Sequence, residues 1–259
     1  MTFKVVIPAR YSSTRLPAKP LLDICGVPMV VRVAQQAAKS GAEQIIVATD
    51  HAEILQAVKS YGFEAIMTRP DHVSGTDRIA EVAWMLNWTY DTIVVNVQGD
   101  EPLIEPSLIS EVAANLLANV EAVMSSACHA INEKAAFTNP NVVKVVLDAN
   151  CHALYFSRAP IPYPRDAFTA ELPLSNKMDI YRHIGIYGYR VSFLKNYANL
   201  KTPMIEKIEN LEQLRVLYHG YKISMFITEN LPACGVDTQA DLDFVRNLTV
   251  KLLSSESQG

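Results

Sequence analysis

Short apolar runs rich in β-branched residues alternate with longer amphipathic stretches through the first half of the chain. The apolar runs cover residues 3–9, 44–49, 64–68 and 92–97. The amphipathic stretches, which have the spacing of helices, cover residues 28–40, 52–61, 76–87 and 106–119. This alternation predicts βαβ crossovers and a Rossmann-like α/β fold, with a mostly parallel sheet and helices on both faces. Ligands of such sheets bind beyond the carboxyl ends of the strands.

The second half of the chain has a different pattern. We expect strands at residues 142–147 and 153–157, joined as a hairpin, and further strands at 181–189 and 222–228. Helices are expected at 205–219 and from 238 to about 253, the second opened by a capping box of Thr238 and Asp241. Since no stretch is polar enough to be a linker, we predict one domain over residues 1–259 with an inserted β-rich lobe at about 139–190.

Composition excludes several classes of protein. The 259 residues carry a formal charge of −4, so no global positive field attracts nucleic acid, and we expect neither a nucleic-acid nor a membrane partner. The helix-like run at 109–131 is interrupted by polar residues well before a membrane-spanning length. No leader peptide is evident, and a cytoplasmic location is expected. The four cysteines (Cys25, Cys128, Cys151 and Cys234) lie far apart, which predicts separate apolar fillers.

Three cations follow the first predicted strand, where a parallel sheet binds phosphate. Arg10 and Arg15 can fork onto phosphate oxygens, and Lys19 supplies a point charge. No glycine precedes Gly26 in this loop, which excludes a nicotinamide-binding fingerprint and a P-loop there. The alternative is a solvated basic loop without a ligand.

Two further loops end predicted strands. Ser74 to Arg78 opens a helix whose free N–H groups are ready donors, although an ordinary N-cap explains the same residues. Asp100 ends another strand, a usual place for a Mg²⁺ ligand in phosphoryl transfer, whereas we expect the neighbouring Glu101 to cap a helix.

Several motifs resemble those of the sugar-activating cytidylyltransferases, and in particular the branch that acts on the acidic sugar 3-deoxy-manno-octulosonate (Kdo). The resemblance extends from Phe3 to the last helix. The motifs include Pro8-Ala9-Arg10-Tyr11, Ser13-Thr14-Arg15-Leu16-Pro17, Ser74-Gly75-Thr76-Asp77-Arg78, Asn96-Val97-Gln98-Gly99-Asp100-Glu101-Pro102, Arg182-His183-Ile184-Gly185-Ile186-Tyr187 and Gly235-Val236-Asp237-Thr238. One departure is Ala18, where the family usually has glycine. If that position has a positive φ, alanine costs about 1 kcal/mol.

The resemblance implies an enzyme that converts CTP and Kdo to CMP-Kdo and pyrophosphate with Mg²⁺, for lipopolysaccharide biosynthesis in the cytoplasm. It implies catalysis by Arg10, Arg15, Lys19 and Asp100, with Asp100 and Asp237 as metal ligands. The implied nucleotide-binding residues are Pro8, Ala9, Arg10, Arg15, Lys19, Ser74, Arg78 and Gln98. The implied sugar-binding residues are Arg158, His183, Tyr187, Glu212 and Gln213.

Other interpretations stay open for these residues. Asp237 can serve as the N-cap of the last helix, and a strand histidine or tyrosine is more often a packing residue. A related keto-sugar acid, such as an amino-substituted Kdo, is an alternative substrate, and a non-catalytic nucleotide-binding protein is an alternative function. The family's habit of dimerising, with the aromatic residues between Asn139 and Tyr189, predicts a homodimer.

Overall fold

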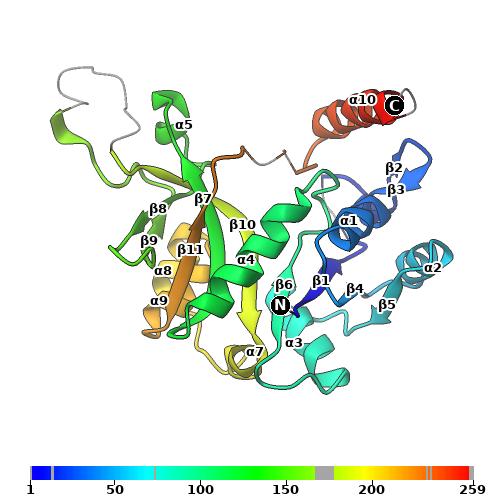
Figure 1. The fold of residues 1–259 in the computed structure, drawn as a ribbon, viewed down its shortest axis with the longest axis horizontal. Helices are drawn as coiled ribbons and strands as arrows, with labels where there is room; N and C mark the ends of the chain where they lie inside the picture. Colours follow the sequence, from blue (N-terminus) through cyan, green and yellow to red (C-terminus); the bar gives the residue numbers. More distant parts are fainter. Residues whose placement is uncertain are drawn as a thin grey trace. The chain divides into compact units, whose positions relative to one another are not determined.

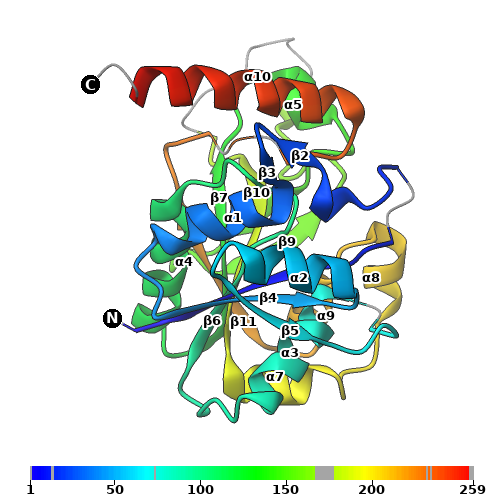
Figure 2. The ribbon, with the colours of Figure 1, turned by 90° about the vertical axis from the view of Figure 1, so that its right-hand side faces the viewer.

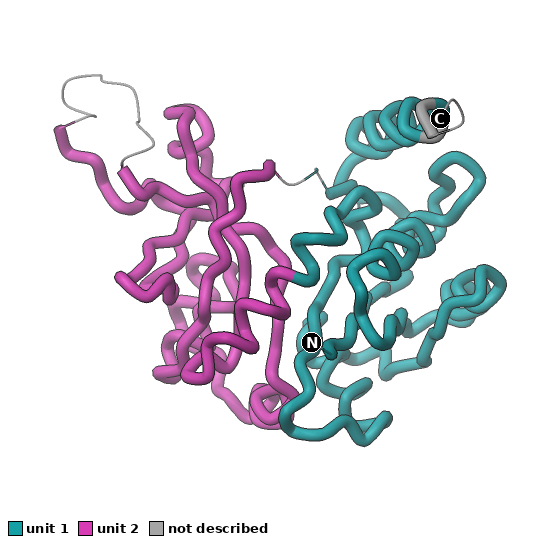
Figure 3. The backbone as a smooth tube through the Cα atoms, in the orientation of Figure 1, with its two compact units in different colours: residues 1–110, 232–259 teal, residues 111–231 magenta. Residues whose placement is uncertain are grey.

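The computed structural model describes residues 2–12, 15–72, 74–166, 178–231, 233 and 235–256. The chain divides into two compact units (Figure 3). Unit 1 comprises residues 1–110 and 232–259, and unit 2 comprises residues 111–231. The expected lobe at about 139–190 lies inside unit 2, which begins earlier, at Glu111.

Unit 1 contains the predicted parallel sheet. Its strands run in the order β6-β1-β4-β5, and each neighbouring pair is parallel. The strands are β1 (Lys4–Ala9), β4 (Gln44–Thr49), β5 (Glu64–Met67) and β6 (Ile93–Asn96). The β1 residues Val5, Val6 and Ile7 are fully buried, because helices cover both faces of such a sheet and make its strands read as continuous apolar runs.

The helices of unit 1 follow from the strand order. The strand path runs outward from β1 to β5, so the right-handed crossovers place α1 (Met29–Ala38) and α2 (Ala52–Ser60) on one face. The chain then returns to β6, which places α3 (Gly75–Met85) on the other face (Figure 1). The helix α4 (Pro106–Ala118) follows β6; it begins in unit 1 and continues into unit 2, which starts at Glu111. These elements confirm the expectations from the first half of the sequence.

Two small elements and the last helix complete unit 1. The 3-10 helix η1 (Lys19–Leu21) precedes a hairpin of β2 (Asp23–Ile24) and β3 (Val27–Pro28), which the sequence patterns did not predict. The helix α10 (Gln239–Glu256) lies over this hairpin (Figure 2). Its capping box is confirmed, because the Thr238 amide donates to Asp241 at 2.8 Å and the Asp241 amide donates to Thr238 Oγ1 at 3.3 Å.

Unit 2 is built on strands of mixed direction. Its strands are β7 (Ala122–Ala130), β8 (Lys144–Leu147), β9 (Ala153–Ser157), β10 (Tyr181–Arg190) and β11 (Lys222–Ile227). Its helices are α5 (Lys134–Thr138), α7 (Val191–Tyr197), α8 (Met204–Glu209) and α9 (Gln213–Tyr218). β7 pairs antiparallel with β10 and parallel with β11, and β8 pairs antiparallel with β10 and with β9. The β8–β9 hairpin is therefore confirmed.

The structure differs from the sequence patterns in three places. The helix expected at 106–119 is confirmed as α4, but the second part of the helix-like run at 109–131 is the strand β7, which was not predicted. The helix expected at 205–219 is two helices, because Asn210 adopts a left-handed conformation (φ 52°, ψ 52°) that ends α8. Cys151 is an exposed free thiol rather than an apolar filler, while Cys128 is buried as expected, and Cys234 lies outside the described residues. Within the described part of the chain, no helix has both the length and the apolar character to cross a bilayer.

Candidate active site

Two carboxylates of unit 1 converge on one ammonium group. Lys19 Nζ lies 2.6 Å from Asp100 Oδ2 and 3.1 Å from Asp237 Oδ1, and Arg15 Nη2 lies 2.9 Å from the same Asp237 oxygen. These residues come from η1, the loop after β6, the segment before α10 and the loop after β1. Two carboxylates this close repel each other unless a cation lies between them. The pairing of Asp100 with Asp237 that was expected from the sequence is thus present as proximity, with Lys19 as the cation.

Backbone contacts hold these carboxylates in place. The Val236 amide donates to the Asp100 carbonyl at 2.8 Å, which ties the segment before α10 to the loop after β6. A Cβ at Gly99 would lie 2.8 Å from the Pro8 carbonyl oxygen, so only glycine allows this approach of the two loops. Thr238 rather than Asp237 caps α10, which leaves the Asp237 carboxylate to the cations.

The residue that departs from the family pattern has the conformation that favours glycine. Ala18 has φ 50° and ψ 33°, and its carbonyl accepts from the Leu21 amide at 2.8 Å to open η1. The left-handed region costs a residue with a Cβ roughly 1–2 kcal/mol. The chain therefore positions Lys19 through a strained turn.

Glu101 differs from its neighbour Asp100. Burial, with a smaller contribution from the negative charge of Asp100, raises the pKa of the Glu101 carboxyl to about 8. At pH 7 the folded protein therefore favours the neutral form of the Glu101 carboxyl. Of these two neighbours, it is Asp100 whose carboxylate contacts Lys19.

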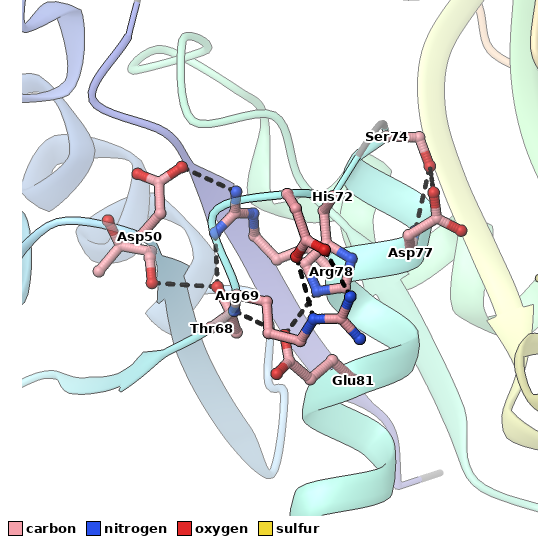
Figure 4. Close-up of polar contacts among 10 residues, drawn as sticks. Asp50, Thr68, Arg69, His72, Ser74, Asp77, Arg78 and Glu81 are labelled. Carbon is pink, nitrogen blue, oxygen red and sulfur yellow. Dashed lines mark hydrogen bonds and ion pairs between the residues drawn. The ribbon is translucent and has the colours of Figure 1, made fainter.

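A second polar cluster of unit 1 surrounds Arg78 (Figure 4). Arg78 is 4% exposed, its Nη2 lies 2.9 Å from Asp50 Oδ2, and its Nη1 donates to Thr68 Oγ1. Asp50 also accepts from the Tyr11 amide at 3.1 Å, so one carboxylate fixes both the guanidinium and the loop after β1. Sequence patterns missed Asp50, because a lone aspartate after a strand carries no distinctive signal.

The other expected nucleotide residues lie at the end of β1 or in the segments that follow β1, β5 and β6. Ser74 caps α3 by accepting from the Asp77 amide at 3.1 Å, which is the ordinary role considered for it. Pro8 lies beside α3, because a Cβ at Gly75 would be 3.5 Å from Pro8 Cγ. Of the remaining residues, Ala9 is buried, Arg10 is exposed and Gln98 is half-buried.

In unit 2, backbone carbonyls engage the Arg158 guanidinium. Its Nε donates to the Glu209 carbonyl at 2.7 Å and its Nη1 to the Pro140 carbonyl at 3.0 Å, while the Arg158 amide donates to Glu209 Oε2 at 2.9 Å. The fully buried Lys144 donates to the carbonyls of Asn139, Val142 and Arg158. Burial lowers the pKa of Lys144. This network fixes Arg158 against the end of α8.

The remaining expected sugar residues lie in the same unit. His183 is buried, its ring is 5.5 Å from that of Tyr187, and its Nε2 is 2.9 Å from Ser126 Oγ. Glu212 is exposed at the start of α9, and Gln213 is 4% exposed. Among the described residues, Gln213 Nε2 is buried without a hydrogen-bond partner, so this amide has a donor left for a ligand. Lys144 and Ser126 were not predicted, because buried polar residues on strands resemble ordinary core positions. Glu209 was not predicted either, because an acidic residue at the end of a helix carries no distinctive signal.

Comparison with known proteins shows the family to which the chain belongs. The sequence profile of the cytidylyltransferase family matches residues 4–223. A solved structure of CMP:2-keto-3-deoxy-manno-octonic acid synthetase in complex with CTP is similar over 96% of this chain and 98% of that chain, with 43% sequence identity and a TM-score of 0.87. A family match of this length, beside two carboxylates at the carboxyl edge of a parallel sheet, establishes that the chain belongs to the cytidylyltransferase family.

Proposed function

We propose that the protein activates Kdo with CTP, giving CMP-Kdo and pyrophosphate. The observation that carries the proposal is the convergence of Asp100 and Asp237 on the Lys19 ammonium. This arrangement concentrates both charges needed for nucleotidyl transfer at one point, since carboxylates hold a metal ion and an ammonium binds phosphate. The 43% identity with a Kdo-activating enzyme supports the choice of sugar.

The residues of unit 1 serve the nucleotide in this proposal. Arg10, Arg15 and Lys19 bind the triphosphate, and Arg10 is exposed and well suited to this. The cytidine contacts come from Pro8, Ala9, Ser74, Arg78 and Gln98, which lie on or beside the carboxyl ends of β1, β5 and β6. Asp50 holds Arg78 in one orientation, so that the guanidinium needs no reorganisation when the nucleotide binds.

The carboxylate pair fits Mg²⁺. Carboxylate oxygens are its preferred protein ligands, and it usually takes only one or two of them beside waters and substrate phosphates. In the described segments no cluster of three or more histidine, cysteine, aspartate or glutamate side chains competes for a metal. When bound by Asp100 and Asp237, Mg²⁺ would neutralise phosphate charge and lower the pKa of the sugar hydroxyl.

The residues of unit 2 serve the sugar acid. Kdo has a carboxylate beside its reacting anomeric carbon, which calls for cations, and several hydroxyls, which call for hydrogen-bond partners. Arg158 supplies a fixed positive charge, while Gln213, Glu212, His183 and Tyr187 supply polar groups. The Gln213 Nε2 group, which has no hydrogen-bond partner in the part of the chain that the structure describes, supports this assignment.

The chemistry is an in-line displacement. The anomeric hydroxyl oxygen of the sugar bonds to the α-phosphorus of CTP, the bond from that phosphorus to the bridging oxygen breaks, and pyrophosphate leaves with its electron pair. The hydroxyl proton passes to solvent. Catalysis rests on positioning and on neutralisation of charge by Arg10, Arg15 and Lys19. We further propose a homodimer in the cytoplasm that supplies lipopolysaccharide biosynthesis.

Pyrophosphate release tests the proposal. The purified protein is incubated with each of the four nucleoside triphosphates and a panel of 2-keto-3-deoxy sugar acids that includes Kdo and an amino-substituted Kdo. We expect release with CTP and Kdo in the presence of Mg²⁺. Preference for the amino-substituted Kdo would mean that this sugar, and not Kdo, is the substrate. CTP binding without pyrophosphate release under any condition would mean that the protein binds nucleotides without catalysis.

A further inference from the structure

A buried serine of unit 2 contacts both the His183 ring and the backbone beside it. Ser126 lies on β7 and is fully buried. Its Oγ is 2.9 Å from His183 Nε2, 2.8 Å from the Ile186 carbonyl oxygen and 3.1 Å from the Ile184 carbonyl oxygen. The pairing of β10 with β7 shifts its register between Ile184 and Tyr187, and this bulge brings both carbonyls to the same hydroxyl.

Counting protons fixes the direction of these hydrogen bonds. A serine hydroxyl has one proton, and the two carbonyl oxygens can only accept it. If the hydroxyl donates to a carbonyl, Nε2 must carry a proton and donate to Oγ, which makes two hydrogen bonds. If the hydroxyl instead donates to Nε2, only one bond forms and two carbonyl oxygens face the lone pairs of Oγ. The first arrangement is therefore the stable one.

The surroundings keep the ring neutral and oriented. The Phe156 ring packs edge-on against His183, with centroids 4.9 Å apart, and the Tyr187 ring lies 5.5 Å away. Burial lowers the pKa of His183 to about 3, so the ring has one proton at pH 7. With that proton on Nε2, the lone pair is on Nδ1, and within the described part of the chain Nδ1 has no hydrogen-bond partner.

We propose that Ser126 is a positioning residue that locks His183 in the Nε2–H tautomer, so that Nδ1 accepts a hydrogen bond from a hydroxyl group of the sugar acid. This inference rests on the proposed function for the identity of the ligand. A neutral ring with a lone pair on Nδ1 repels a carboxylate oxygen but accepts an O–H group. His183 therefore distinguishes the hydroxyls of the sugar, and the carboxylate is left to cationic residues.

The tautomer is tested by nitrogen NMR of the full-length protein labelled with ¹⁵N in its histidines, at pH 7. The signals of His183 are assigned by their absence from His183→Asn. We expect a protonated Nε2 and an unprotonated Nδ1 in the wild type. A protonated Nδ1 would overturn the proposal outright, and this arm does not depend on which sugar the enzyme uses.

Kinetics test the role of Ser126, with Ser125 as the matched control. Ser125 is the next residue of the same strand, equally buried, and its Oγ donates to the Val112 carbonyl at 2.8 Å. In Ser126→Ala we expect loss of the single tautomer and a rise of about 3- to 10-fold in KM for Kdo, with KM for CTP unchanged. Ser125→Ala should show neither effect.

The outcomes separate the two claims. If wild-type protein shows the expected tautomer but releases no pyrophosphate with any sugar acid, the proposed function fails and the positioning by Ser126 stands. Equal effects of Ser125→Ala and Ser126→Ala on KM for Kdo would mean that the change acts through packing, which overturns the proposal. If Ser126→Ala does not fold, the His183 tautomer measured by NMR in the wild type tests the proposal by itself.

Discussion

Lys19 is the residue on which the proposed nucleotide site of unit 1 depends. Its side chain is only 13% exposed, and the side chains of Asp100 and Asp237, which it contacts, are 38% and 51% exposed. The lysine side chain is therefore buried more deeply than the two carboxylate side chains that it contacts.

The paired carboxylates give the first prediction. Asp100→Asn and Asp237→Asn should each keep the fold and remove nearly all turnover, because an amide has the shape of a carboxylate without its charge. Turnover is measured across a Mg²⁺ titration, and folding by thermal unfolding. Thr238, and not Asp237, caps α10. If Asp237 nevertheless had only a capping role, Asp237→Asn would stay active, because asparagine caps about as well as aspartate. Wild-type-like turnover of this variant with unchanged metal dependence would refute the role of Asp237 as a metal ligand.

The loop cations give the second prediction. Arg10→Ala and Lys19→Ala should each weaken the use of CTP, since the loss of a charge-assisted contact costs about 1.5–3 kcal/mol. Steady-state KM for CTP and kcat/KM are the measurements, with Kdo at saturation. Lys39→Ala, on the exposed end of α1, is a control that removes a positive charge away from the site. Near-normal kinetics for both loop variants would contradict the assignment of Arg10 and Lys19 to triphosphate binding.

His183 gives a prediction for stability against pH. Its pKa is lowered from 6.5 to about 3 in the folded protein, so between these values the unfolded chain binds a proton that the folded chain does not. Stability is therefore full above pH 6.5 and is lost as the pH falls towards 3, by at most about 1.4 kcal/mol per pH unit. The free energy of unfolding of wild type and of His183→Gln is measured by urea unfolding at several pH values between 3 and 7. We expect the free energy to fall less steeply with falling pH in the variant. An equal dependence on pH in the two proteins would contradict the lowered pKa of His183.

Site residues at strand ends were predictable from the sequence, whereas buried supporting residues were not. Arg10, Lys19 and Asp100 stand out because charges follow apolar runs at the edge where parallel sheets bind ligands. Asp50, Lys144 and Ser126 act through other residues or the backbone, so their roles appear only when the chain is folded. Of the residues proposed to bind the sugar, Arg158 follows a strand and was a candidate from the sequence, whereas the other four came from family resemblance alone.

At the scale of elements, periodicity predicted the parallel sheet well and the mixed strands of unit 2 less well. The strands of unit 1 are buried on both faces and punctuated by Gly41 and Gly62, both with positive φ. β7 was missed because its apolar residues, among them Val123 and Met124, continue the apolar pattern of α4. The break between α8 and α9 depends on the left-handed Asn210, which no period of hydrophobicity reveals.

The approach of two loops in unit 1 gives a prediction at this scale. Gly99→Ala should lower the free energy of unfolding by about 1–3 kcal/mol and weaken CTP use, because the new Cβ would meet the Pro8 carbonyl at 2.8 Å. Gly185→Ala is the matched control, since a Cβ there meets nothing within 4 Å. Denaturant unfolding and KM for CTP are compared. Equal, small effects of the two substitutions would show that the loop can move aside.

At the scale of the whole molecule, unit 2 presents apolar surface that supports the proposed homodimer. Leu154, Tyr155 and Tyr163 are 59%, 36% and 66% exposed, while Phe156 is buried, and Phe168 lies outside the described residues. We expect a dimeric mass by analytical ultracentrifugation at micromolar concentration, and weaker association in Leu154→Lys. Trp84→Lys, which changes a 71% exposed residue of unit 1, is the control. A monomeric wild type would contradict the prediction.

The discontinuity of unit 1 has a consequence for synthesis of the protein. A ribosome completes β1, η1 and the loop that carries Asp100 before any of unit 2 exists, yet Asp237 and α10 emerge only after unit 2. Until then Leu16, Ile24 and Met29 lack the α10 residues that cover them, and Lys19 faces a single carboxylate. Closing so long a loop is entropically slow, so the first unit to begin is the last to finish. If the proposed site is correct, a nascent or prematurely ended chain has the loop cations but only one of the two carboxylates, and we expect no nucleotidyl transfer before synthesis has passed Asp237.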